Sequence, residues 1–142
     1  MKTTNEILFI SNTDIKQLKR IPEGTKKVFC SGLGLTKLPK LPSTLTHLHC
    51  QDNDLEKIPK LPIGLEVLDC SNNKLKNIPN LPSSLKTLII NGNKMTDISF
   101  ASYINNHDLD IGDYGSLIEF LNDNTAGGIV SSEATNLINE NF

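Results

Sequence analysis

The sequence lacks tryptophan and has few aromatic residues, five Phe and two Tyr among 142 residues. Its longest uninterrupted apolar run is Ile7–Ile10, whereas a membrane-spanning helix needs about 20 such residues. A secretory signal is not expected, because a single lysine near the start is followed by a short apolar patch that Glu6 interrupts. We therefore expect no membrane span and a cytoplasmic location, in the producing cell or in a host cell.

Basic residues are missing from the last part of the chain. Residues 101–142 contain 7 acidic residues and no Lys or Arg, a net charge of −7. Residues 1–100 contain all 14 basic residues and 9 acidic ones, a net charge of +5, and all 7 prolines and 3 cysteines. This shift predicts a repeat domain over 1–100 and an acidic C-terminal cap over 101–142.

The first hundred residues repeat with a period of 20. Written in rows of 20, the sequence is apolar at positions 8, 10, 15 and 18 of all five rows. A fixed period of roughly 20–50 residues is typical of a stacked repeat fold. Positions 7–11 alternate as in a strand with one buried face, so positions 8 and 10 are expected to point inward.

The rest of each row favours a turn and an extended return. Position 13 is Asn53, Asn73 and Asn93 in the last three rows, and asparagine can turn the chain while its amide bonds the backbone. The prolines of segment 38–42 and of its copies favour extended or polyproline geometry. We therefore predict a curved repeat solenoid with a parallel sheet on its concave side and an extended convex side.

The acidic region is expected to close this solenoid. Leu109 and Ile111 continue the inward pattern and predict a sixth strand. Ser116–Leu121 then has apolar residues at helical spacing behind a possible serine cap, which favours a short helix over the last core layer. For residues 124–142, a second short helix and disorder both fit the sequence.

Residues 45–55 read LTHLHCQDNDL and fit the pattern LxxLxLxxNxL. With the LPxxL opening of the last three rows, this pattern resembles the leucine-rich repeat family, most closely the short bacterial-type repeats of enteric effector proteins and some viral proteins. The resemblance implies a non-enzymatic, protein-binding horseshoe. Larger relatives carry a ubiquitin-ligase domain with a catalytic cysteine; because no cysteine follows Cys70, that activity is not expected here.

Positions 7 and 9 of each row are expected to face the partner on the concave side. Phe9 and Phe29 are neighbouring aromatics there, and exposed aromatics are typical anchors of an interface. An N-terminal flank or the folded-back C-terminal tail would remove that surface by covering it. The predicted partner-binding residues are Phe9, Lys27, Phe29, His47, His49, Val67, Asp69, Thr87 and Ile89.

Metal chemistry is an alternative on the same face. Two imidazoles and a carboxylate can bind a divalent metal, so His47, His49 and Asp69 could form a metal-binding or metal-dependent catalytic site. The competing interpretation is a polar part of a protein-contact surface, with no cofactor and no catalytic residue.

The three cysteines are expected to be structural. Cys30, Cys50 and Cys70 are 20 residues apart in one inward column, whereas zinc ligands generally occur in close pairs such as CxxC. Neighbouring parallel strands also have poor geometry for a disulfide. These residues are therefore predicted to be small apolar members of the core.

A basic stripe is the remaining candidate, at positions 17 and 20 of the rows. It consists of Arg20, Lys37, Lys40, Lys57 and Lys60. Such a stripe can bind phosphate backbones, but the net negative charge and the lack of interleaved aromatics favour a solvated surface or one approached by the acidic tail.

The preferred hypothesis is a protein-binding module, encoded by a virus or a bacterium, that occupies a host factor. We expect a monomer. Self-association through the exposed strand of the first row is an alternative.

Overall fold

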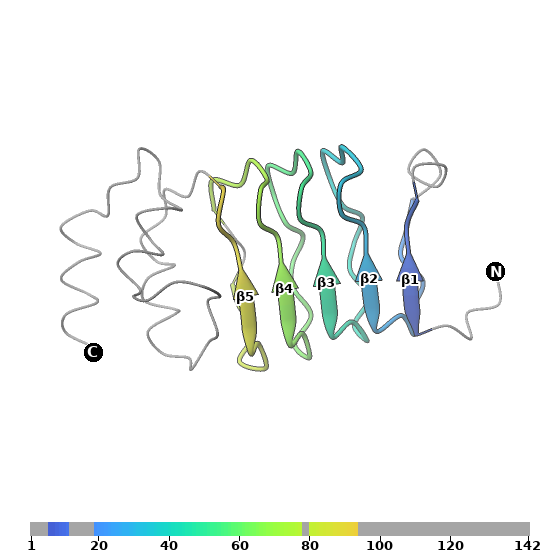
Figure 1. Cartoon of the computed structure of the whole chain (residues 1–142). Coiled ribbons are helices and arrows are strands. Elements are labelled where there is room, and N and C mark those ends of the chain that lie inside the picture. Colours follow the sequence, from blue (N-terminus) through green and yellow to red (C-terminus); the bar gives the residue numbers. More distant parts are fainter. Residues whose placement is uncertain (1–5, 12–18, 78–79, 94–142) are drawn as a thin grey trace, which may run out of the picture.

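The structure is a computed structural model that describes residues 6–11, 19–77 and 80–93. Five short strands follow one another along the chain: β1 (Ile7–Phe9), β2 (Lys27–Phe29), β3 (His47–His49), β4 (Val67–Asp69) and β5 (Thr87–Ile89). They lie side by side in chain order and form one parallel sheet (Figure 1). The register advances by 20 residues at each step, so that Leu48 lies opposite Val28 and Leu68.

The core consists of the inward residues of stacked coils, as the periodicity predicts. The central residues of β2–β5 are completely buried, and so are the residues two positions further on: Val28, Leu48, Leu68, Leu88, Cys30, Cys50, Cys70 and Ile90. One coil alone cannot cover these side chains, but neighbours about 4.8 Å away can. Burial of each leucine contributes roughly 2 kcal/mol to stability, which makes stacking the source of the fold.

A buried asparagine bonds the backbone of two successive coils. The Nδ2 group of Asn53 donates to the carbonyl oxygens of Cys30 and Cys50 at 2.9 and 3.0 Å. Its Oδ1 accepts from the backbone N–H groups of Leu33 and Leu35, both at 3.0 Å. In the asparagines 20 and 40 residues later, Nδ2 likewise donates to carbonyl oxygens of two successive coils, and Oδ1 accepts from one backbone N–H. These bonds satisfy peptide groups that the turn would otherwise bury without partners.

The return from strand to strand is extended. Within the described residues the chain forms turns, bends and extended segments between the strands, and no helix. Leu38 and Leu41 each directly precede a proline of their return segment and are 8% and 5% exposed. The coil is then closed by a turn in which the Leu45 N–H donates to the Pro42 oxygen at 3.2 Å. This part of the chain also contains no helix long and apolar enough to cross a membrane.

The predicted cap lies outside the described residues. The sixth strand at Leu109 and Ile111, the helix Ser116–Leu121 and the segment 124–142 all fall there. The division at residue 100 therefore stays a prediction.

Candidate protein-binding face

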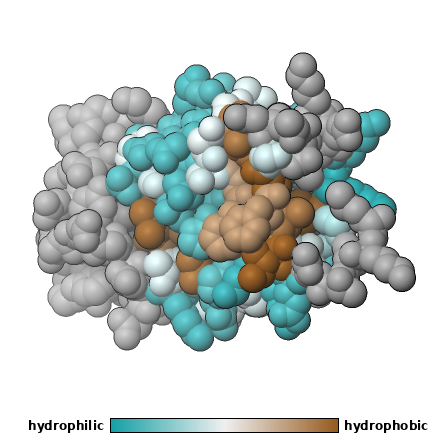
Figure 2. Space-filling model, turned by 45° about the vertical axis from the view of Figure 1, so that its right-hand side comes forward, coloured by the Kyte–Doolittle hydropathy of each residue, from teal (hydrophilic) through white to brown (hydrophobic). Residues whose placement is uncertain are grey.

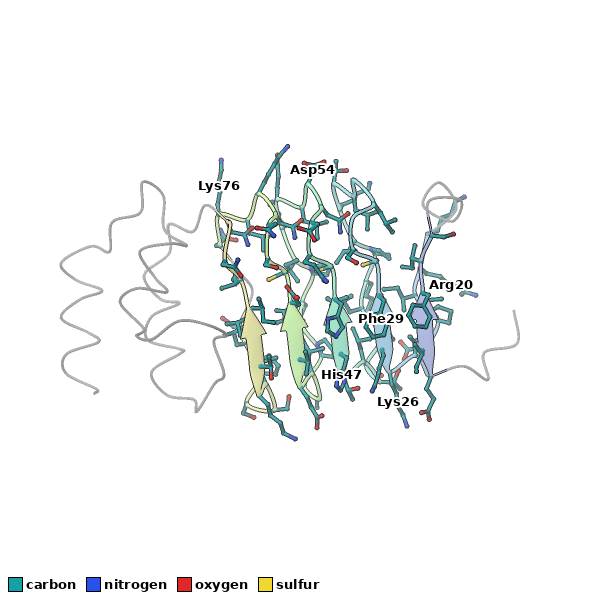
Figure 3. The ribbon with its side chains drawn as sticks, viewed as in Figure 1. Arg20, Lys26, Phe29, His47, Asp54 and Lys76 are labelled. Carbon is teal, nitrogen blue, oxygen red and sulfur yellow. The ribbon has the colours of Figure 1, made fainter. Side chains whose placement is uncertain are left out.

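The first and third residues of each strand point to the outer side of the sheet, which is called the concave face below. In β2–β5 these residues are partly exposed on either side of a buried central residue. Figure 3 labels two of them, Phe29 on β2 and His47 on β3. The face consists of Ile7, Phe9, Lys27, Phe29, His47, His49, Val67, Asp69, Thr87 and Ile89.

Three rings from successive strands stack on this face. The ring centroids of Phe9 and Phe29 are 5.0 Å apart with an interplanar angle of 13°. Those of Phe29 and His49 are 4.7 Å apart with an angle of 8°. The spacing follows from the sheet, because parallel neighbours about 4.8 Å apart hold rings in one column at stacking distance. We call Phe9, Phe29 and His49 the ring stack.

The ring stack leaves apolar surface exposed at the β1 end. Phe9 is 70% exposed and Ile7, on the same strand, is 42% exposed. Figure 2 brings this end forward and shows hydrophobic surface gathered on it. Contiguous exposed apolar surface of this kind marks interaction sites in soluble proteins.

Polar groups lie beside the ring stack. Lys27 is opposite His47 in the β2–β3 register. Partial burial lowers the pKa of His47, and the charge of Lys27 lowers this pKa further. The Nδ1 atom of His47 lies 2.9 Å from the Thr46 hydroxyl oxygen. At neutral pH the imidazole is therefore an uncharged hydrogen-bonding group next to an ammonium ion.

The metal alternative lacks a suitable geometry. Asp69 does lie opposite His49, as the repeat predicts. Its Oδ1, however, accepts from the Ser71 hydroxyl at 2.7 Å and from the Ser71 N–H at 3.2 Å. Among the described residues, no three His, Cys, Asp or Glu side chains are grouped so that they could hold a metal ion. His47, His49 and Asp69 are neighbours on the concave face without forming a ligand set.

The three cysteines are free thiols inside the core, as predicted. Burial raises the pKa of Cys30 to about 11. The pKa values of Cys50 and Cys70 are also raised, by burial first and by the nearby Asp69 charge in addition. Neutral thiols of this kind are packing groups and poor nucleophiles.

The basic stripe is exposed and lies outside the strands. Its members Arg20, Lys37, Lys40, Lys57 and Lys60 belong to the segments that return from one strand to the next. Other lysines form ion pairs between coils, each with an acidic residue 20 positions earlier: Lys26–Glu6, Lys74–Asp54 and Lys86–Glu66. Exposed pairs of this type contribute at most about 1 kcal/mol each.

Two features of the face were not anticipated from the sequence. The first is that His49 extends the stacking of the two phenylalanines. The second is that Asp69 is bonded by Ser71. The sequence signal for the stacking of His49 was that Phe29 and His49 both occupy position 9 of their rows. Periodicity assigns side chains to such positions but does not fix the rotation of a ring.

Comparison with known proteins identifies the repeat. A family model described as leucine-rich repeats (2 copies) matches residues 63–103. A solved Shigella effector leucine-rich-repeat domain matches with 34% identity and a TM-score of 0.62, over 66% of this chain and 43% of that chain. These coils are leucine-rich repeats. The similarity to a bacterial effector domain also agrees with the short, bacterial-type repeat that the sequence predicts.

A second solved leucine-rich-repeat structure, YopM from Yersinia enterocolitica, is 26% identical with a TM-score of 0.42, over 55% of this chain and 22% of that chain. The chain thus spans less than half the length of both solved structures. No curated protein matches the sequence.

Proposed function

We propose that this leucine-rich-repeat protein binds a partner protein through its concave face and catalyses no reaction. Leucine-rich-repeat domains are generally protein-interaction modules, and solenoids of this kind bind along their extended concave surfaces. The observation that carries the proposal is the ring stack, with Phe9 70% exposed at its end.

Rigidity of the strands supports this use of the face. The Cys30 N–H donates to the His49 oxygen at 2.9 Å, and the Cys50 N–H donates to the Asp69 oxygen at 2.8 Å. Backbone bonds of this type hold each strand against the next one, so the side chains above them are held in place before a partner arrives. A preformed surface loses little ordering entropy on binding.

The chemistry of the face favours a particular kind of anchor. An apolar or aromatic side chain of the partner would cover the ring stack, as buried anchors do in other interfaces. Lys27 and His47 on one side of the stack, and Asp69 beyond His49, would pair with polar groups around that anchor. We expect the anchor to contribute most of the affinity and the polar groups to fix its orientation.

The partner proposed here is a host factor, and the place of action is the cytoplasm. The support is the similarity to a bacterial effector domain at 34% identity. Binding to immobilised protein is therefore to be compared in extracts of the producing organism and of host cells. Fractionation of both cell types, followed by immunodetection, tests the location.

The deciding experiment combines Phe29→Ala with His49→Ala, because these changes remove two of the three stacked rings. Partner capture should be lost while the melting temperature stays nearly unchanged, since both side chains are only partly buried. Lys57→Ala, an exposed change on the return side, serves as the matched control and should capture normally. Undiminished capture by a folded double variant would refute the concave-face assignment.

A further inference from the structure

The outer edge of β1 carries N–H and C=O groups whose counterparts in β2–β5 are hydrogen-bonded to the preceding coil. In β2–β5, the N–H of the first strand residue donates to the preceding coil, as His47 N–H does to the Lys26 oxygen at 3.0 Å. The oxygen of the third residue accepts from the preceding coil, as the His49 oxygen does from the Cys30 N–H at 2.9 Å. Among the described residues no strand precedes β1 to pair its equivalents, the Ile7 N–H and the Phe9 oxygen.

The side chains of β1 are also less covered than the corresponding side chains of the later strands. Leu8 is only partly buried, whereas the corresponding residues of β2–β5 are completely buried. Ile7 and Phe9 are two of the three large hydrophobic residues that are exposed in the described part of the chain. The strand contains no charge and no proline, which are the usual protections of a sheet edge.

We propose that β1 pairs antiparallel with β1 of a second copy of this chain, which joins the five described strands of each copy into one continuous sheet. The pairing is centred on Leu8, so that Ile7 lies opposite Phe9 of the second copy. Neighbouring residues of an antiparallel pair alternate between bonded and non-bonded positions. This register uses the outward N–H and C=O groups of both Ile7 and Phe9, and it places each half-buried Leu8 against the other.

Charge and packing favour this occupant over an unrelated strand. The segment Ile7–Phe9 is apolar throughout, so in the antiparallel direction it meets an equally apolar copy of itself. Glu6, already paired with Lys26 at 2.8 Å, would lie about 13 Å from its symmetry mate, farther than the screening length in physiological salt. The concave faces of both copies would lie on the same side, because opposite residues of an antiparallel pair share a face.

The contact is short, so we expect a reversible dimer and not a permanent one. Sedimentation or light scattering of the full chain, over about 1–500 µM, should show the mass rising from one copy towards two, as expected for micromolar or weaker association. Ile7→Pro removes an N–H that has no partner among the described residues in a single copy. In the pair this N–H of each copy would donate to the Phe9 oxygen of the other, so two hydrogen bonds would be lost. Phe9→Lys places a charge on the same edge. Each change should weaken association at least about tenfold.

Ile63→Lys is the matched control, because Ile63 is 89% exposed but lies away from β1; this variant should associate as the unchanged chain does. Amide hydrogen exchange at Ile7 should also slow as the protein concentration rises. A single copy at every concentration, a larger open assembly, or equal association by the Phe9→Lys variant would overturn the proposal. The Phe29→Ala, His49→Ala double variant leaves β1 unchanged and should associate as the unchanged chain does while losing partner capture, so the two proposals can fail independently.

Discussion

The side-chain amide of Asn53 donates to the carbonyl oxygen of Cys30, 23 residues earlier, at 2.9 Å. The same nitrogen bonds the Cys50 oxygen within its own coil at 3.0 Å. One buried side chain therefore holds two coils at a fixed separation. The stacking of apolar columns and the distances on the concave face both depend on that separation.

Asn53→Ala should destabilise the protein by about 3 kcal/mol or more, because several buried backbone groups lose their partner and each costs about 1–3 kcal/mol. Urea denaturation followed by circular dichroism measures the change. Asn77→Ala, an exposed asparagine in the next coil, is the control and should stay within about 0.5 kcal/mol of the unchanged protein. Equal midpoints for the two variants would contradict this role of Asn53.

Gly92→Ala should also destabilise the protein, by about 1–3 kcal/mol. Gly92 has a φ of +73°, and an added Cβ would collide with Oδ1 of Asn72 and lie 3.2 Å from its Cα. Gly64 is the matched control, since its Cβ would meet nothing within 4 Å and its φ is not positive. Thermal melts of both variants test the difference, and a Gly92→Ala melt at or above that of Gly64→Ala would be the opposite of our expectation.

The native thiols should react slowly with Ellman's reagent at pH 8. Burial raises the pKa of all three, that of Cys30 to about 11, so very little thiolate forms. In denaturant all three should react rapidly. Fast native labelling of Cys50 would show that the interior of the solenoid opens much more often than this packing implies.

Acid should destabilise the protein partly through His47. Its folded pKa lies below the ordinary value of 6.5, so the unfolded chain binds more protons at mildly acidic pH. Stability from this residue is present above the ordinary pKa and is lost as the pH falls from there towards the folded pKa. The unchanged protein should therefore lose more stability between pH 8 and pH 5 than His47→Gln, as urea denaturation at both pH values measures. The difference should be small, because His47 is only partly buried.

The sequence predicts the repeat and the orientation of its residues well, because both follow from spacing. Alternation about Leu48 is enough to place His47 and His49 outside and Cys50 inside. The interactions within one column are harder to predict. Neither the parallel rings of Phe29 and His49 nor the hydrogen bonds between Asp69 and Ser71 follow from a period of 20, because side-chain rotation depends on local packing.

The constant register of 20 residues has a consequence for how such a chain can change in length. Removal or duplication of one whole 20-residue unit keeps every remaining leucine buried in the core. A single-residue insertion within a strand would instead move the apolar side chains of that strand to the exposed face of the sheet. Whole-unit changes between β3 and β5 would also leave Phe9, Phe29 and His49 untouched. Evolution or design could thus lengthen or shorten the solenoid while the ring stack at its β1 end stays unchanged.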